Sequence, residues 1–134
     1  MIVDTSGLLA LFNDKEAAHA DVQRVIDESD EEFVVSPFVV AEIGYLVATR
    51  QGVDAELAVL QQLSGAFELP EITGSDLAMT VRLIECYRDQ DIGVTDASLV
   101  VLAARYGTRK ILTLDRRHFT VLRPGRGHAF VLLP

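Results

Sequence analysis

The fold is decided first by the stretch MIVDTSG, residues 1–7. Three apolar residues come directly before Asp4, and residues 5–7 are typical of a helix start. An apolar run that passes at once into a helix indicates a buried strand of an α/β unit. Because that strand ends at Asp4, its carboxylate is expected at the carboxyl edge of a sheet, where α/β proteins gather their sites. The same position also suits a helix cap.

Further along the chain, apolar periodicity predicts strands that alternate with helices. Besides residues 1–3, strands are expected at 33–35, 110–114 and 130–133, with a short candidate at 67–70. Helices are expected over 8–12, from after Asp14 to about Asp27, over 37–51, 53–66 and 74–87, and from Thr95 to about 106. This order predicts an α/β fold with a mostly parallel sheet covered by helices on both faces.

Length and composition are those of a compact globular protein. The 134 residues are 49% hydrophobic and 24% charged, which suits one domain, 1–134, with one core. The net charge of −8 argues against broad electrostatic coating of nucleic acid, so any contact with nucleic acid must be local. No apolar span approaches the roughly 20 residues of a membrane helix, and no basic stretch precedes the first apolar run. A cytoplasmic protein without membrane contact is expected.

The single cysteine, Cys86, excludes an internal disulfide framework and a multi-cysteine zinc site. It lies in the apolar stripe of the helix expected over 74–87, so we expect a buried thiol rather than a nucleophile. The glycine patterns of dinucleotide sites and phosphate loops do not occur, so no nucleotide cofactor is expected.

Three further acids occupy informative positions. Glu42 lies in an apolar stripe of its helix, because its neighbours three and four residues away are Phe38, Val39, Tyr45 and Leu46. Asp96 follows Thr95, the expected cap of a core helix, and Asp115 ends an apolar strand. Each acid also has an ordinary explanation. Glu42 fits a glutamate that reaches solvent, Asp96 fits an acid of the first helical turn, and Asp115 fits a salt-bridged turn.

Four carboxylates brought together would repel one another, with a repulsion energy of several kcal/mol, unless a cation lay between them. Oxygen ligands suit Mg²⁺ or Mn²⁺, and two such ions about 4 Å apart can orient water and stabilise the attacking and leaving oxygens of a phosphodiester. The set therefore points to a metal-dependent nuclease in which Asp4, Glu42, Asp96 and Asp115 bind metal and carry the catalysis.

Four ordered motifs resemble the signature of PIN-domain ribonucleases and, more narrowly, of the VapC toxins of bacterial toxin–antitoxin pairs. They are residues 1–6 (MIVDTS), the mid-helix Glu42, residues 95–97 (TDA) and residues 112–119 (LTLDRRHF). The resemblance spans the full length and implies a three-layer α/β/α sandwich. It also implies a Mg²⁺- or Mn²⁺-dependent endoribonuclease that cuts structured RNA, either transfer or ribosomal RNA, and so inhibits translation.

The resemblance assigns roles within the site. Asp4 and Asp96 would be the principal metal ligands, and Glu42 would complete the set or position the attacking water. In such sites the acid that corresponds to Asp115 is the one most often replaced by another residue or linked to the metal through a water molecule. The neighbouring hydroxyls of Thr5, Ser6 and Thr113 would orient these ligands. RNA would be bound by the cations near Asp115, each of which is equally well explained as a solvated side chain: Arg116, Arg117, His118, Arg123 and Arg126.

The resemblance also implies partners. A VapB-like antitoxin would lay a helical tail into an apolar groove and block the active site, the toxin would form a homodimer, and DNA would be contacted only through the antitoxin. The sequence itself shows only apolar helix faces that a small domain can leave open, such as that of Leu57, Val59, Leu60 and Leu63.

Two other classes of protein stay open. One is another Mg²⁺-dependent phosphohydrolase. Aspartyl-phosphate chemistry usually requires a second acid two residues after the first, and two residues after Asp4 this chain has Ser6. The other is a catalytically silent PIN-like binding module, which would not need Glu42 in an apolar stripe. The RNA that is cut also stays open among transfer, ribosomal and messenger RNA.

Overall fold

The computed structural model describes residues 1–125 and 127–134, and its centre is a four-stranded sheet. The strand order is β2-β1-β3-β4, and every pairing is parallel, with Ile2 beside Val34 and Ile111. The strands are β1 (Ile2–Val3), β2 (Val34–Val35), β3 (Lys110–Leu112) and β4 (Val131–Leu133). The expected parallel sheet is confirmed.

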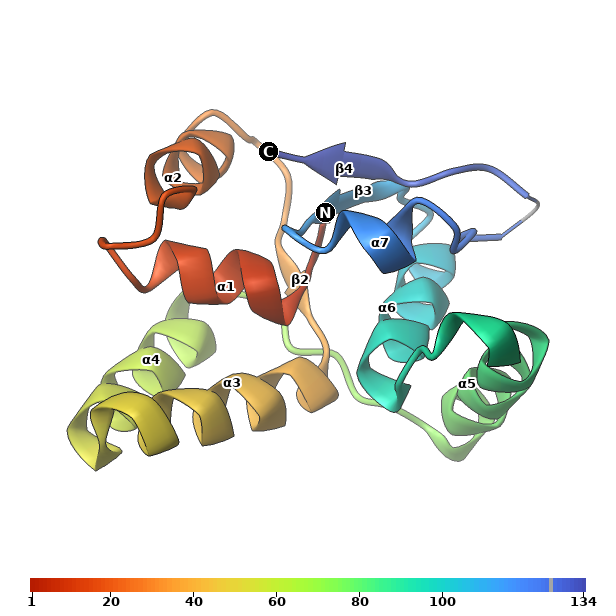
Figure 1. Cartoon of the computed structure of the whole chain (residues 1–134), viewed down its shortest axis with the longest axis horizontal. Helices are drawn as coiled ribbons and strands as arrows, with labels where there is room; N and C mark the ends of the chain where they lie inside the picture. The colour runs from red at the N-terminus through yellow and green to blue at the C-terminus, as the bar shows by residue number, and fades with distance from the viewer. Residues whose placement is uncertain (126) are drawn as a thin grey trace.

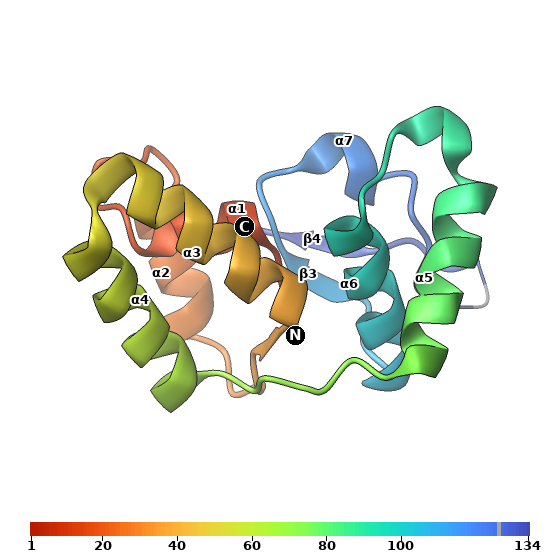
Figure 2. The same ribbon diagram turned by 90° about the horizontal axis from the view of Figure 1, so that it is seen from below.

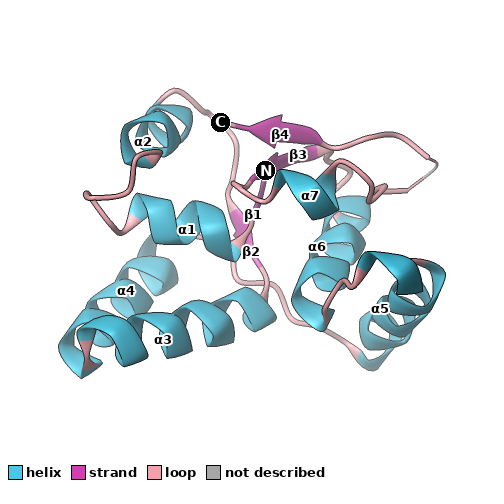
Figure 3. Cartoon of the chain, in the orientation of Figure 1, coloured by secondary structure: helices cyan, strands magenta, loops and turns pink. Residues whose placement is uncertain are grey.

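Helices cover both faces of this sheet. α1 to α4 lie on one side and α5 and α6 on the other, which Figure 1 and the perpendicular view in Figure 2 both show. The strands form a small central layer between the two groups (Figure 3). The helices of the described residues are α1 (Thr5–Leu11), α2 (His19–Asp27), α3 (Pro37–Gln51), α4 (Val53–Ala66), α5 (Gly74–Cys86), the 3₁₀ turn η1 (Arg88–Gln90), α6 (Val94–Arg105) and α7 (Arg116–Phe119). The expected α/β/α sandwich is confirmed.

The core is centred on the inner strands and α6. Seven consecutive residues of α6, Ala97–Ala103, are buried, and this helix contacts β1 directly. A helix that is apolar on nearly all sides must be enclosed by other elements. The first turn of α6 is thereby fixed against the rest of the molecule, as expected for the helix that carries Asp96.

The start of α1 lies unusually close to the end of β3. A Cβ atom added to Gly7 would lie 2.6 Å from the carbonyl oxygen of Leu112, which also accepts a 3.0 Å hydrogen bond from the Asp4 N–H. Only glycine allows this approach, because side-chain atoms do not fit against a backbone oxygen at that distance. Gly7 therefore lets the residue after β1 reach the end of β3.

Three expectations about elements were wrong in detail. α2 begins at His19, because residues 13–18 form turns instead of helix. The segment 67–70 contributes a single bridge between Glu68 and Val34 and not a strand. α6 is not capped by Thr95, since its cap position is Gly93, whose N–H donates to the Asp96 carboxylate over 3.1 Å.

The thiol of Cys86 is exposed, so the expectation of a buried thiol was wrong. α5 packs against α6 over one narrow face, which includes the buried Thr80, and leaves apolar side chains open on its other faces. These exposed side chains are Leu77, Met79 and Val81. Among the described residues, no helix is long and apolar enough to cross a membrane.

We expect Gly7→Ala to lower the free energy of unfolding by about 1–3 kcal/mol, because the added methyl forces α1 away from the end of β3. Urea denaturation measures the change. Gly65→Ala in α4 is the matched control: a Cβ there meets nothing within 4 Å, so the variant should be as stable as the wild type or more so by about 0.5–1 kcal/mol. Equal stability of the two variants would contradict the close approach at Gly7.

Candidate active site

The carboxyl ends of β1, β2 and β3 meet at one edge of the sheet, and a polar residue follows each strand. These residues are Asp4, Ser36 and Thr113, and all three are buried. Ser36 Oγ lies 2.8 Å from Ser98 Oγ of α6, so a buried hydroxyl pair joins the starts of α3 and α6. The two helices that carry the other expected acids therefore begin at the edge where Asp4 lies.

Asp4 is held by two hydroxyl groups. Its Oδ2 accepts hydrogen bonds from Ser6 Oγ at 2.6 Å and from Thr113 Oγ1 at 2.8 Å. Each hydroxyl oxygen accepts in turn from a backbone N–H, Leu114 N on Ser6 and Asp115 N on Thr113, both at 2.9 Å. Within the described residues Asp4 Oδ1 accepts no hydrogen bond, so this oxygen remains free for a cation.

This arrangement corrects two expectations. Asp4 occupies the cap position of α1, but its side chain makes no capping hydrogen bond, so the helix-cap interpretation was wrong. β3 ends at Leu112 and not at Leu114. The N–H of Thr113 still donates to the Leu133 oxygen of β4, but the N–H groups of Leu114 and Asp115 bond to the hydroxyls of Ser6 and Thr113 instead of extending a strand.

Glu42 lies on α3 with its carboxylate directed to the same edge, where Oε2 accepts a 2.7 Å hydrogen bond from Thr5 Oγ1. The expectation that its stripe is buried was wrong: Glu42 is exposed, and the exposed fraction of Tyr45 is 70%. The reason is that α3 is a long helix whose buried face runs through Val39, Ile43 and Val47, beside Glu42 and not around it.

Asp96, in the first turn of α6, is mostly buried, with a side chain that is 20% exposed. Burial raises the pKa of its carboxyl group above the ordinary value, and the charges of Asp4 and Asp115 raise it further. The N–H of Gly93 and the ring of His118 act in the opposite direction but do not cancel these effects. The first-turn explanation is therefore incomplete, because this acid also lies in the field of two others.

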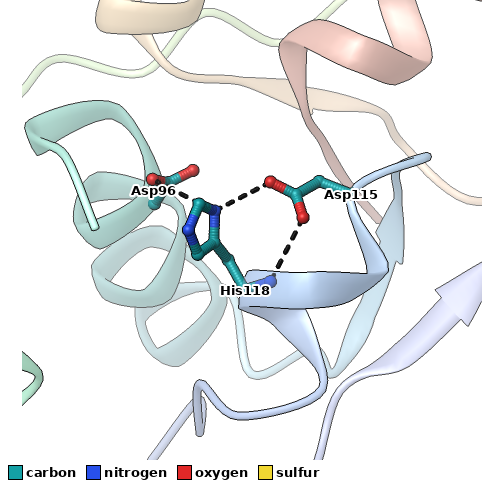
Figure 4. A group of neighbouring side chains, drawn as sticks. All are labelled: Asp96, Asp115 and His118. Atoms are coloured by element: carbon teal, nitrogen blue, oxygen red, sulfur yellow. Dashed lines mark hydrogen bonds and ion pairs between the residues drawn. The ribbon is translucent and has the colours of Figure 1, made fainter. Parts of the chain in front are cut away.

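Asp115, which precedes α7, and His118 of α7 form a pair opposite Asp96 (Figure 4). The His118 Nδ1 atom lies 2.8 Å from Asp115 Oδ2 and 3.9 Å from Asp96 Oδ2. Asp115 Oδ1 accepts the N–H of His118 at 3.1 Å and so caps α7. The sequence suggested His118 as an RNA-binding cation, whereas the structure turns its ring inward, between the acids.

The four acids and His118 line one hollow of about 380 Å³. It is lined by Asp4, Thr5, Ser6, Leu9, Glu42, Leu46, Gly93, Thr95, Asp96, Asp115 and His118. The four acids expected from the sequence thus lie in one place, although they come from four segments of the chain. His118 is the one chemically active side chain of this hollow that the sequence motifs did not assign to the site.

The lining groups fit a divalent cation. Ligand atoms of Asp96, Asp115 and His118 all lie within 4.8 Å of one another, which is close enough to surround one ion. Asp4 and Glu42 lie outside this trio but add carboxylate oxygens to the same hollow. Carboxylates suit Mg²⁺ and Mn²⁺, and a ring nitrogen suits Mn²⁺ better than Mg²⁺.

The expected RNA-binding cations are used in different ways. Arg116 donates to the backbone oxygen of Pro134, and Arg123 Nη1 donates to three carbonyl oxygens at the end of α7. Arg117 is exposed, and its side chain makes no hydrogen bond or ion pair within residues 1–125 and 127–134. Arg126 lies outside the described residues.

Comparison with known proteins agrees with this geometry. The family model described as PIN domain matches residues 1–123. This chain belongs to the PIN-domain family. The PIN domain is also 56% identical, over 135 aligned residues and the full length of both chains, to a protein of Mycobacterium tuberculosis named ribonuclease VapC26. The resemblance to PIN-domain and VapC-type proteins is confirmed.

Solved structures share the fold of this PIN domain. A crystal structure of Mycobacterium tuberculosis VapC20, described as a sarcin–ricin loop cleaving toxin, matches with a TM-score of 0.78 and 22% identity over 86% of this chain and 89% of that one. Rickettsia felis VapBC2, solved on a DNA fragment from its promoter, matches with a TM-score of 0.72 and 14% identity over 98% and 95% of the two chains. At these identities the likeness shows the fold alone.

The raised pKa of Asp96 predicts how the stability of the folded chain depends on pH. A carboxyl group whose pKa is higher in the folded chain than in the unfolded chain lowers folding stability at pH values above both. We therefore expect metal-free Asp96→Asn to be more stable than wild type at pH 7, because the amide keeps the Gly93 contact without the charge. The gain should shrink as the pH falls towards about 4, the unfolded pKa of aspartate. Urea denaturation in the presence of chelator measures this gain in stability, with Asp14→Asn at an exposed position as the control. A variant Asp96→Asn that is less stable than wild type at pH 7 would contradict the expectation.

Proposed function

We propose that this chain, as a single domain of residues 1–134, is a metal-dependent endoribonuclease and the toxin of a type II toxin–antitoxin pair. The observation that carries the proposal is the convergence of four carboxylates on one hollow at the carboxyl edge of the sheet. The 56% identity with a ribonuclease of the VapC type supports it. Burial and the charges of Asp4 and Asp115 raise the pKa of Asp96, as expected where acids are kept together to bind a cation.

Asp4, Glu42, Asp96 and Asp115 would hold Mg²⁺ or Mn²⁺. When bound, such an ion lowers the pKa of a water molecule and stabilises the charge that develops on a phosphodiester during attack. The chain supplies orientation: Thr5 holds one oxygen of Glu42, while Ser6 and Thr113 hold one oxygen of Asp4. In each case the other oxygen of the carboxylate stays available, as in sites whose outer hydrogen bonds fix the ligands in advance.

RNA would reach this site through local cations, because the chain as a whole carries −8 charges. Arg117 is the best placed of the described arginines, since it is exposed and directly follows the turn at Asp115. Arg116 and Arg123 bond to backbone oxygens, so part of their role is structural. Transfer, ribosomal and messenger RNA all fit this chemistry.

The partner would be a VapB-like antitoxin, with any contact to DNA made by the antitoxin and with a homodimer of the toxin. A second hollow, of about 430 Å³, lies between α1, α3 and α4 and adjoins the acids, because both hollows share Ser6, Leu9 and Leu46. Its lining is mixed: apolar side chains such as Val47 and Val59 alternate with polar ones such as Arg50. A helical tail in this groove would therefore extend to the active site and block it.

Cleavage of total cellular RNA by the purified chain tests the proposal. We expect discrete fragments with Mg²⁺ or Mn²⁺ and none with chelator. Asp4→Asn and Glu42→Gln should each lower the cleavage rate by about 10²–10³-fold, because each removes a pre-organised charge from the reaction site. The fragments themselves would identify the RNA and the cut sequence.

Asp89→Asn is the matched control, since Asp89 is exposed in η1 and should leave cleavage unchanged. Cleavage that survives both Asp4→Asn and Glu42→Gln would locate the nuclease elsewhere. If the folded protein cuts no RNA under any of these conditions, a catalytically silent binding module becomes the better interpretation.

A further inference from the structure

His118 is built into the site although it is neither an acid nor an exposed cation. Its side chain is 18% exposed, and it lines the same hollow as the four carboxylates. The next residue, Phe119, is fully buried and packs edge-on against Phe130, with ring centroids 5.6 Å apart. This aromatic contact anchors α7 to the core and so fixes where the imidazole lies.

The contacts of His118 are concentrated on one partner. Asp115 Oδ1 accepts its backbone N–H at 3.1 Å, and Asp115 Oδ2 lies 2.8 Å from its Nδ1 atom. Both oxygens of this carboxylate are therefore engaged by a single residue (Figure 4). An ionised carboxylate only accepts hydrogen bonds, so Nδ1 is the ring atom that donates.

The second ring nitrogen makes no such contact. His118 Nε2 is buried and has no hydrogen-bond partner among the described residues. A buried polar atom without a partner is unfavourable and asks for an explanation. The explanation that fits here is that the Nδ1 contact with Asp115, and the approach to Asp96 at 3.9 Å, are what hold the ring in this place.

Without the ring, the Asp115 carboxylate would keep only its 3.1 Å contact with the backbone N–H of residue 118. The Asp115 side chain is 32% exposed and lies before a helix of only four residues, so rotation towards solvent is open to it. Asp4 is restrained by two hydroxyls and Glu42 by one, and His118 performs the corresponding task for Asp115.

We propose that His118 is a positioning residue, which holds the Asp115 carboxylate facing the cation site through its Nδ1–H group. The inference rests on the proposed metal-dependent function and adds a residue to it. It replaces direct ligation by His118, which the spacing of the ligand atoms of Asp96, Asp115 and His118 would also allow and in which a ring nitrogen would itself contact the ion.

Two variants of nearly equal polarity separate these roles. The amide nitrogen of His118→Asn lies as many bonds from the backbone as Nδ1 does, whereas that of His118→Gln corresponds to Nε2. The dissociation constant for Mn²⁺, measured by electron paramagnetic resonance of the free ion without RNA, should stay close to wild type in His118→Asn. It should rise about 10–100-fold in His118→Gln, as for other residues that orient metal ligands.

The background variant Asp115→Asn completes the test. If His118 acts through Asp115, adding His118→Gln to Asp115→Asn should weaken Mn²⁺ binding no further, and thermal unfolding checks that all variants are folded. Equal weakening by His118→Asn and His118→Gln, or no weakening by His118→Gln, would overturn the positioning role.

These outcomes are distinct from failure of the nuclease proposal. A wild-type chain that binds Mn²⁺ with the expected dependence on residue 118 but cuts no RNA would refute the nuclease alone. A chain that cuts RNA while His118→Gln keeps full Mn²⁺ affinity would refute the role of His118 alone. Absence of any Mn²⁺ binding by the wild type would overturn both.

Discussion

The hydrogen bonds that converge on Asp4 Oδ2 join the ends of the two central strands. Ser6 brings the start of α1 to this oxygen and Thr113 brings the end of β3, while the N–H groups of Leu114 and Asp115 orient the two hydroxyls. A carboxylate that is only 6% exposed needs such donors, because burial of an unpaired charge is strongly unfavourable. The close approach at Gly7, the early end of β3 and the turn that carries Asp115 all follow from this junction.

Asp96, by contrast, lowers the stability of the folded chain at neutral pH. The pKa of Asp96 is raised by burial and by neighbouring charge, because the ionised carboxylate is less favourable in the folded chain than in water. A divalent cation among the four acids would reverse the sign of these interactions. The site thus shows the tension between stability and function that is expected where a protein keeps like charges together in advance of a ligand.

The sequence predicted the fold well wherever apolar residues and strand ends coincide. The strand that ends before Asp4 and the strand that leads to the turn of Asp115 were predicted because both sheet faces are covered, which makes their inner residues apolar. The same logic failed for Cys86 and Glu42, since apolar spacing on a helix does not say how much of that face another element covers. The prediction of Thr95 as a cap was wrong because α6 begins one residue earlier, at Val94, so that Thr95 lies inside the helix.

The four acids of the candidate site were predicted from their places in the chain, but the side chains that hold these acids in position were predicted only in part. The resemblance to PIN-domain proteins pointed to Thr5, Ser6 and Thr113 as orienting hydroxyls, and the structure places each within hydrogen-bond distance of an acid. His118 was missed as part of this arrangement, because one histidine next to two arginines is typical of a basic surface patch. Its distance of three residues from Asp115 on a short helix is the signal that could have found it.

The central claim is that the carboxyl edge of the sheet binds a divalent cation. Anomalous scattering from crystals soaked in Mn²⁺ tests it most directly. We expect a peak within coordination distance of the Asp4 and Asp96 carboxylates, and its loss in Asp96→Asn crystals. A well-ordered hollow without anomalous density, in crystals that bind Mn²⁺ only elsewhere on the surface, would contradict the claim.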